Sequence, residues 1–311
     1  MEPAADSSKR LVIALRCGRL ANRLVLFANV IALAESLKCL ASNVTFHSYA
    51  HLFESTRRNV FCRYPVPATR SWIDAVPGLA AGIRWTRLFP NSVRAACRLN
   101  EQLNGSSRQV ITLREIRGRP VTLLDDPEIL ARLDPARTVF VYGWRFRAPT
   151  CVEAHADKIR AYFRPIDPIE SACRDSLESM RRDCDELIGV HIRQGDYRTW
   201  KQGRFFFPIA KYAAWMRELA EQLPGRRVAF FVCSDEPRSA SEFPGLQVHF
   251  GGASPLQDLC TLAGCDAIVG PPSTFSQWAS FYGNRPLLHL QDAEVHPERA
   301  GFRVSNLLEI P

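Results

Sequence analysis

The sequence predicts an α/β protein built from two Rossmann-like domains that face a cleft. Short apolar runs rich in β-branched residues alternate with helical patterns near both ends of the chain. Loops with glycine and polar side chains follow several of these runs, as in parallel sheets with helical crossovers. The chain has 311 residues, enough for two domains that each bury an apolar core.

The N-terminal half begins with a strand, a loop and a helix. Residues 10–15 predict a buried parallel strand, and residues 22–38 predict a helix that Asn22 caps. Residues 138–144 predict another strand, whereas the stretch 60–137 has few clean periods.

The C-terminal half has a more regular pattern. Its predicted strands cover 187–192, 227–233, 246–250, 267–270 and 286–290, and its predicted helices cover 211–223, 256–263 and 275–282. The proline-containing segment 163–168 is the expected linker. We therefore expect an N-terminal Rossmann-like domain over residues 1–165 and a C-terminal Rossmann-like domain over residues 166–311.

Composition narrows the functional class. The net charge is +8 and the pI is about 9.1, with arginine spread along the chain, so phosphorylated ligands fit better than a nucleic acid. No stretch is long and apolar enough to span a membrane, and residues 1–9 lack a signal-peptide core. The ten scattered cysteines indicate reduced, mostly buried thiols. We expect a cytoplasmic protein with peripheral contact to the inner membrane.

Two loops of the C-terminal half carry side chains suited to a nucleotide. His191-Ile-Arg-Gln-Gly-Asp-Tyr197 and Ser234-Asp235-Glu236 each follow a predicted strand. Arg193 offers a planar donor fork for a diphosphate, and the carboxylate of Asp235 can accept both N–H donors of a guanine edge. The alternatives are a salt-bridged strand end, in which Arg193 pairs with Asp196, and a helix N-cap at Ser234-Asp235.

Two further loops complete the set. Pro271-Pro-Ser-Thr-Phe-Ser-Gln-Trp278 starts a helix whose first N–H groups form an anion site. Its alternative is a capped helix that packs Phe275 and Trp278 into the core. Gly18-Arg-Leu-Ala-Asn22 follows the first strand, and its alternative is an ordinary strand-to-helix turn.

In combination and order, these motifs resemble the fucosyltransferase superfamily, which groups α-1,2-, α-1,6- and protein O-fucosyltransferases, and most closely the bacterial α-1,2-fucosyltransferases. The family pattern is G-x-L-G-N-Q, then H-[IV]-R-R-G-D-Y, then S-D, then a C-D strand running into S-[ST]-F-S-W-W. The resemblance covers the first 40 residues and about 158–290. The matching segments are Gly18 to Arg23, Tyr162-Phe-Arg-Pro165, His191 to Tyr197, Ser234-Asp235, Cys265-Asp266 and Ser273 to Trp278.

The resemblance implies a GT-B-like fold and an inverting, metal-independent transfer of L-fucose from GDP-fucose to a hydroxyl of a glycan acceptor. It also implies that the domain of residues 1–165 lies on the acceptor side and that the domain of residues 166–311 binds the GDP-sugar. It implies that Arg193 holds and neutralises the β-phosphate of GDP as it leaves, that His191 lines the nucleotide pocket, and that Asp235 reads guanine. Asp196 is expected to be the base or to orient the acceptor hydroxyl, with locking of Arg193 as the alternative. The remaining implied contacts to the diphosphate, nucleoside or sugar are Asn22, Ser273, Thr274 and Phe275.

Four residues depart from the family pattern. Gln194 replaces its second arginine, and Gln277 replaces its first tryptophan; Ala21 and Arg23 replace a glycine and a glutamine. Two alternatives therefore stay open: a transferase that uses another GDP-sugar, and a non-catalytic relative that binds nucleotide-sugars or glycans.

Metals and other partners have little support in the sequence. The D-x-D at Asp183-Cys-Asp185 precedes its strand, the wrong side for a nucleotide-bound metal, so we expect no metal and no cofactor. No nucleic-acid motif is present, and the first loop lacks the G-x-G-x-x-G of a Rossmann dehydrogenase. The expected partners are a GDP-sugar donor and a glycan acceptor, namely lipopolysaccharide, exopolysaccharide or an oligosaccharide.

Overall fold

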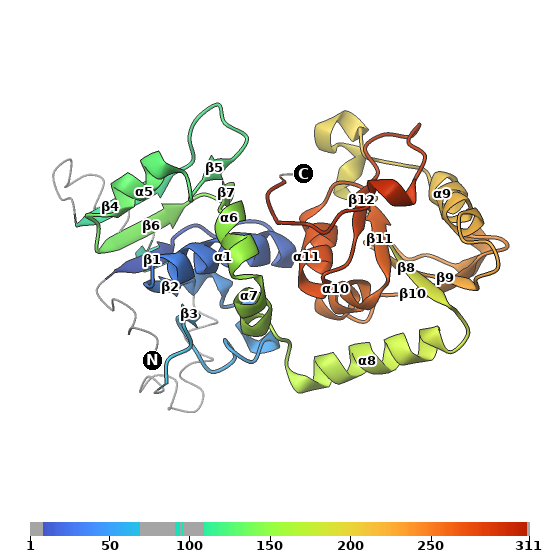
Figure 1. Ribbon diagram of the computed structural model, residues 1–311, viewed down its shortest axis with the longest axis horizontal. Coiled ribbons are helices and arrows are strands. Elements are labelled where there is room, and N and C mark those ends of the chain that lie inside the picture. Colours follow the sequence, from blue (N-terminus) through green and yellow to red (C-terminus); the bar gives the residue numbers. More distant parts are fainter. Residues whose placement is uncertain (1–8, 69–90, 94, 96–108, 310–311) are drawn as a thin grey trace. The chain divides into compact units, whose positions relative to one another are not determined.

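The computed structural model describes residues 9–68, 91–93, 95 and 109–309 (Figure 1). Its contacts divide the chain into two units. Unit 1 extends to Ile166 and includes the C-terminal segment from Leu307, and unit 2 is Asp167–Asn306. The domain boundary predicted from the sequence lies one residue earlier, between residues 165 and 166.

Unit 1 contains a five-stranded sheet of order β3-β2-β1-β6-β4, in which only β3 runs antiparallel to its neighbour. A separate pair of parallel strands, β5 and β7, completes its β-structure among the described residues. The strands are β1 (Arg10–Ile13), β2 (Leu40–Ser42), β3 (Arg63–Tyr64), β4 (Val110–Arg114), β5 (Thr122–Leu123), β6 (Thr138–Tyr142) and β7 (Phe146–Arg147).

The helix α1 (Leu20–Ser36) lies at the centre of unit 1, and nearly all of its residues are buried. The other helices described in this unit are α5 (Pro127–Leu133), α6 (Pro149–Ala154) and α7 (Ala156–Tyr162). The expected N-cap at Asn22 is wrong, because α1 begins two residues earlier and its N-cap is Arg19. Gly18 has a φ of +49°, and the Asn22 side chain packs against the space its missing Cβ leaves. Much of the predicted irregular stretch 60–137 lies outside the described residues.

Unit 2 is a doubly wound domain with a fully parallel sheet of order β10-β9-β8-β11-β12. The strand order reverses between β8 and β11, and in such sheets the crevice at this switch point is where ligands bind. Its strands are β8 (Glu186–Ile192), β9 (Val228–Ser234), β10 (Gln247–Phe250), β11 (Ala267–Gly270) and β12 (Leu287–His289), and its helices are α8 (Asp167–Arg181), α9 (Ile209–Glu221), α10 (Pro255–Gly264) and α11 (Thr274–Gly283).

The alternation of side chains along β8 separates the two faces of this sheet. Ile188, Val190 and Ile192 belong to the core cluster that includes the buried face of α9. Gly189 points the other way, where a Cβ would lie 2.6 Å from Leu262 of α10. Every residue of β8 is buried, which explains why residues 187–190 at its centre carry no charged or polar side chain.

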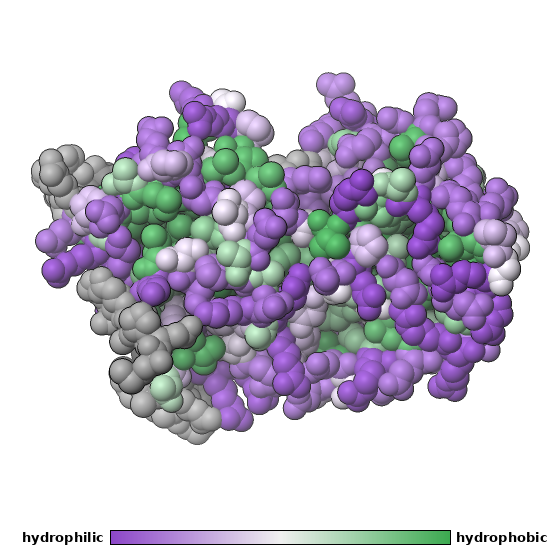
Figure 2. All heavy atoms as spheres, in the orientation of Figure 1, coloured by the Kyte–Doolittle hydropathy of each residue, from purple (hydrophilic) through white to green (hydrophobic). Residues whose placement is uncertain are grey.

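The predicted α/β fold with two Rossmann-like domains of GT-B type is confirmed. The cleft expected between them stays a prediction. The described cysteines are all free thiols, and most are buried, as predicted. Among the described residues, no helix is long and apolar enough to cross a membrane. Figure 2 shows that hydrophilic side chains cover most of the visible face of unit 2.

Candidate functional site

The loops after β8 and β11 meet at the switch point of unit 2. A Cβ at Gly270, the last residue of β11, would lie 2.6 Å from the carbonyl oxygen of His191, so glycine permits this close approach. The His191 ring packs on Phe275 of α11 with 5.1 Å between ring centroids. The hydroxyl of Tyr197 donates to the carbonyl of Pro272. Two motifs far apart in the sequence therefore form one site.

Arg193 is held at this site by one edge of its guanidinium group. Its Nε lies 2.7 Å from Asp196 and 3.3 Å from Asp235, and its side chain is 19% exposed. The salt-bridged strand end is thus present, but it occupies Nε alone. Within the described parts of the chain, neither terminal nitrogen, Nη1 or Nη2, has a hydrogen bond.

The charge on Arg193 is secure. Burial alone would lower the pKa of its guanidinium, but the hydrogen bond with Asp196 and the charge of Asp235 outweigh burial and raise that pKa. A permanent cation with two open donors is therefore fixed at the carboxyl edge of the sheet. Such a group suits a phosphate oxygen.

Gln194, the residue that replaces the family's second arginine, connects the loop to its surroundings. Its backbone N–H donates to Asp235 at 2.8 Å, and its side-chain Nε2 donates to the carbonyl of Phe207 at 2.8 Å. Its own carbonyl accepts from the N–H of Arg198. The side chain is buried, so it supports the backbone instead of gripping a phosphate.

The two carboxylates beside Arg193 differ in exposure. The Asp196 side chain is 60% exposed, whereas that of Asp235 is 16% exposed. Asp235 accepts from Gln194 with Oδ1 and pairs with Arg193 through Oδ2, so both of its oxygens are engaged within the protein. Its predicted contact with guanine would compete with these bonds. The alternative of a helix N-cap at Ser234 is wrong, because the next helical turn is capped by Ser239.

The N-terminus of α11 lies at the other side of the switch point. Ser273 is its N-cap, and its hydroxyl accepts from the N–H of Phe275 at 3.1 Å. Thr274 is the first residue of this helix and is buried. Trp278 is buried as predicted for a core residue, whereas Phe275 packs on His191 and stays partly exposed. The first turn of a helix carries partial positive charge, which favours an anion here.

His191 is a neutral imidazole in this environment. Complete burial, together with the nearby charges of Arg193 and His289, lowers the pKa of its ring from 6.5 to about 3. The buried Nδ1 atom has no hydrogen-bond partner among the described residues. A neutral ring with one open nitrogen can contact a nucleotide without adding charge.

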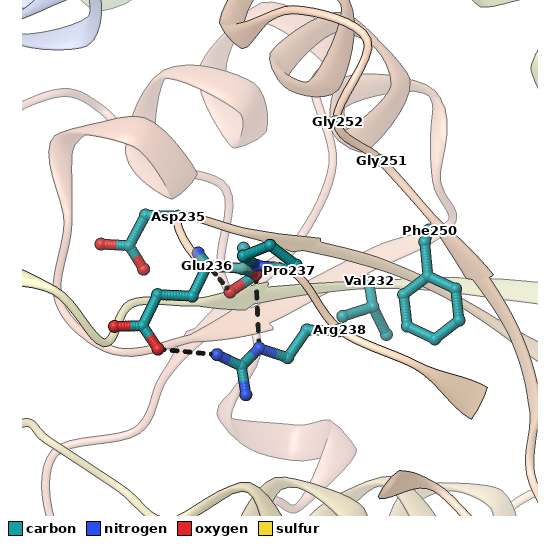
Figure 3. A pocket seen from close by; sticks show the side chains of 9 residues that line it. Val232, Asp235, Glu236, Pro237, Arg238, Phe250, Gly251 and Gly252 are labelled. Carbon is teal, nitrogen blue, oxygen red and sulfur yellow. Dashed lines mark hydrogen bonds and ion pairs between the residues drawn. The ribbon is translucent and has the colours of Figure 1, made fainter. Parts of the chain in front are cut away.

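A pocket of about 370 Å³ opens beside these loops, at the carboxyl ends of β9 and β10 (Figure 3). Figure 3 shows Asp235 and Glu236 at one side of it and Phe250 at the other. Phe250 is 38% exposed, which leaves much of its surface open to a planar ligand. Arg238 also lines the pocket and forms an ion pair with Glu236 at 2.8 Å.

Asp258, in the first turn of α10, contacts two glycines of the pocket wall but is not itself a lining residue, and it was not predicted from the sequence. Its Oδ1 accepts from the N–H of Gly252 at 2.8 Å and packs against Gly251, and both glycines line the pocket. Oδ2 has no partner among the described residues, and burial raises the pKa of the carboxyl group. The only sequence signal was a carboxylate just after a Gly-Gly turn that follows a strand.

Asn22 and Arg23 lie at the carboxyl end of β1, in unit 1. Asn22 is partly exposed, lies in the first turn of α1 and packs against Gly18, and its predicted contact with the phosphate or sugar stays a prediction. Arg23 is 3% exposed and donates to the carbonyls of Cys17, Gly18 and Thr45. This departure from the family pattern therefore stabilises the loop.

No cluster of three or more acidic, histidine or cysteine side chains suited to a metal occurs in the part of the chain that the structure describes. Asp185 lies just before β8, at the amino end of the sheet, where it pairs with Arg227 at 2.8 Å. The D-x-D motif is thus at the edge opposite the site.

Part of the chain matches a known protein family. Residues 152–294 match the model of glycosyl transferase family 11. This segment covers the Arg193 loop, the pocket and the N-terminus of α11. No curated protein matches the chain.

Solved structures of fucosyltransferases share the fold. A variant of Arabidopsis thaliana FUT1 in complex with GDP has a TM-score of 0.54 and 13% identity, covering 97% of this chain and 74% of that chain. POFUT1 in complex with GDP-fucose has a TM-score of 0.51 and 11% identity, covering 91% and 96%. The α-1,6-fucosyltransferase NodZ of Bradyrhizobium, soaked with GDP-fucose, has a TM-score of 0.50 and 16% identity, covering 90% and 94%.

The TM-scores show a shared fold, and the family match over residues 152–294 supports glycosyltransferase activity. The predicted resemblance to the fucosyltransferase superfamily is confirmed on both counts. The chain is a glycosyltransferase whose residues 152–294 carry the pattern of glycosyl transferase family 11 on the fold of the fucosyltransferases.

Proposed function

We propose that the protein transfers L-fucose from GDP-fucose to a hydroxyl of a glycan acceptor, with inversion and without a metal. The observation that carries this proposal is the clamped arginine: two carboxylates fix one edge of Arg193, and its other donors stay open at the switch point. A GDP-sugar supplies the diphosphate that such a cation and the N-terminus of α11 would bind.

The proposed nucleotide position runs along the carboxyl edge of the sheet. The β-phosphate lies between Arg193 and the Ser273–Phe275 turn, His191 lines the nucleoside, and the base enters the pocket beside Phe250. Guanine offers two adjacent N–H donors that match one carboxylate. Asp235, the predicted reader, lines the pocket but already uses both oxygens within the protein, so we propose Asp258, which holds the pocket residue Gly252, as a second candidate.

The chemistry breaks the bond between the anomeric carbon and a β-phosphate oxygen. Negative charge grows on the departing GDP, and the preorganised donors of Arg193 and α11 would stabilise it. The acceptor hydroxyl attacks the opposite face of the sugar, which inverts the anomeric centre. We propose that Asp196 orients this hydroxyl or takes its proton, and that Asn22 of unit 1 contacts the phosphate or the sugar.

The proposal also covers the acceptor, the cellular location and the metal requirement. The acceptor is a lipopolysaccharide, an exopolysaccharide or an oligosaccharide, and the protein works in the cytoplasm with peripheral contact to the inner membrane. The net charge of +8 supports contact with an anionic surface. Equal transfer rates with and without a chelator would support metal independence.

A thermal-shift screen with GDP, GDP-fucose, GDP-mannose, UDP-sugars and dTDP-sugars tests the donor. A ligand at 100 times its Kd adds about 2.7 kcal/mol to the unfolding free energy. We expect the largest shift with GDP-fucose and with GDP. Stabilisation by UDP but not by GDP would overturn the donor assignment. Binding without GDP release, over a panel of acceptors, would favour the non-catalytic alternative.

A further inference from the structure

The loop between β8 and α9 carries cations that the donor site does not use. It contains the turns η3 (Asp196–Arg198) and η4 (Trp200–Gly203) and appears in yellow before α9 in Figure 1. Its exposed cations are Arg198, Lys201 and Arg204. The turn η3 starts at Asp196, the carboxylate proposed to meet the acceptor hydroxyl.

Two of these three cations have no acidic partner among the residues that the structure describes. Arg198 pairs with Glu236 at 3.0 Å, and Glu236 also holds Arg238. Asp196 is bound to Arg193. Lys201 and Arg204 contact only aromatic rings and backbone groups among the described residues. The carboxylates of Asp196 and Glu236 therefore already form ion pairs with other arginines.

Aromatic side chains fix the positions of the two unpaired cations. The Nζ of Lys201 lies 4.6 Å from the ring centroid of Trp200, and the guanidinium of Arg204 lies 5.3 Å from that of Phe205. Trp200 packs between Tyr197 and Phe205, and Phe205 is buried. The rings hold the charges near the surface and lower the entropy lost when a ligand binds.

The backbone of the loop is held in a costly conformation. Lys201 and Gln202 have φ values of 46° and 61°, in the left-handed region that non-glycine residues rarely adopt, and Gly203 follows at 77°. At the loop's end, the carbonyl of Phe207 accepts from the buried side chain of Gln194. Strained backbone of this kind clusters at ligand-binding sites.

We propose that Lys201 and Arg204 form an acceptor subsite that selects a glycan carrying a phosphate or carboxylate group. This inference rests on the proposed function and assigns the chemical class of its acceptor. The anion would lie over the loop while the acceptor hydroxyl lies near Asp196. An anionic glycan satisfies the two unpaired cations, which a neutral glycan would leave unmatched.

The test measures binding of matched sugars by calorimetry, with and without GDP: lactose, 3′-sialyllactose and lactose 6′-phosphate. The wild-type protein should bind both anionic sugars about fivefold more tightly than lactose. The Lys201→Gln/Arg204→Gln variant should lose this preference and keep its affinity for GDP. The Arg174→Gln/Arg182→Gln variant removes the same charge from α8 and the following turn and should keep the preference.

Equal binding of neutral and anionic sugars by the wild-type protein would overturn the proposal, as would an unchanged preference in the Lys201→Gln/Arg204→Gln variant. Flotation with phosphatidylglycerol and phosphatidylcholine vesicles separates the other source of anions. Loss of phosphatidylglycerol binding in that variant, without any sugar preference, would assign the cations to a membrane surface and overturn the acceptor subsite. GDP affinity, measured in the same titrations, reports separately on the proposed function.

Discussion

Arg23 in unit 1 and Arg193 in unit 2 follow corresponding strands, each at the point where the order of its sheet reverses. All three guanidinium nitrogens of Arg23 bond to the protein, through backbone carbonyls and the Ser48 hydroxyl. Arg193 uses Nε alone. The comparison teaches that the residue type does not separate a structural arginine from a ligand-binding one, whereas the state of its donors does.

The largest expected effect is on activity at Arg193. Arg193→Ala removes the cation that stabilises the leaving group, so turnover measured by GDP release should fall about 10²-fold or more. Its free energy of unfolding should fall by about 1–3 kcal/mol, because the largely buried carboxylate of Asp235 loses its cationic partner. Arg193→Lys keeps the charge but loses the planar fork and should recover part of the activity. Turnover near the wild-type level in Arg193→Ala would contradict the assignment of Arg193 as a ligand-binding arginine.

The converse is expected at Arg23. Arg23→Met leaves several buried carbonyls without donors and should lower the free energy of unfolding by about 2–3 kcal/mol in urea titrations. The GDP affinity of the folded protein should stay within about twofold of the wild-type value, because this substitution lies outside the nucleotide contacts proposed in unit 2. Arg19→Met, at the exposed N-cap of the same helix, is the matched control and should be close to neutral. A stable Arg23→Met variant would contradict a structural role.

Two carboxylates sharpen the comparison within unit 2. Asp258→Asn should reduce the preference for GDP over ADP about tenfold or more, because its open oxygen would face the guanine donors. Asp235→Asn should leave base preference nearly unchanged and lower turnover, because Asp235 positions Arg193 and Gln194. Competition binding with labelled GDP measures both. The opposite pattern would return guanine recognition to Asp235.

The smallest expected effect is a pH dependence at His191. Its folded pKa is about 3 against an ordinary value of 6.5, so below pH 6.5 the unfolded chain takes up a proton that the folded one does not. Proton uptake by the unfolded chain favours unfolding. The free energy of unfolding is therefore unaffected by this group above pH 6.5 and decreases as the pH falls from 6.5 toward 3. Between pH 7.5 and 5.5, His191→Gln should lose about 1.4 kcal/mol less stability than the wild-type protein.

Urea titrations at the two pH values measure this difference. His296, with a side chain 74% exposed, is the control, and His296→Gln should follow the wild-type protein. Identical pH profiles for His191→Gln and the wild-type protein would show that the ring is not buried as a neutral group.

The strands of unit 2 could be predicted because parallel strands buried on both faces are continuous apolar runs. β11 has the predicted bounds, and the others shift by one or two residues. The motif residues of this unit came together because the carboxyl ends of parallel strands share one edge of a sheet. Unit 1 was less predictable, since β5 and β7 are two residues long and give no periodic signal.

The sequence could not show which polar groups of the site already bond within the protein and which stay open to a ligand. Asp235 and Asp258 both follow strand ends, and only their hydrogen bonds distinguish the engaged carboxylate from the open one. Gln194 looked like a lost phosphate contact, yet its amide supports the loop through Phe207. These are long-range contacts, which local patterns do not encode.

The central claim is that the open edge of Arg193 binds the β-phosphate of GDP. Calorimetric affinities for GDP and GMP, in the wild-type protein and in Arg193→Ala, test it most directly. We predict that the wild-type protein prefers GDP, and that the variant loses about tenfold or more of that preference while keeping its affinity for GMP. An equal preference for GDP in both proteins would contradict the claim.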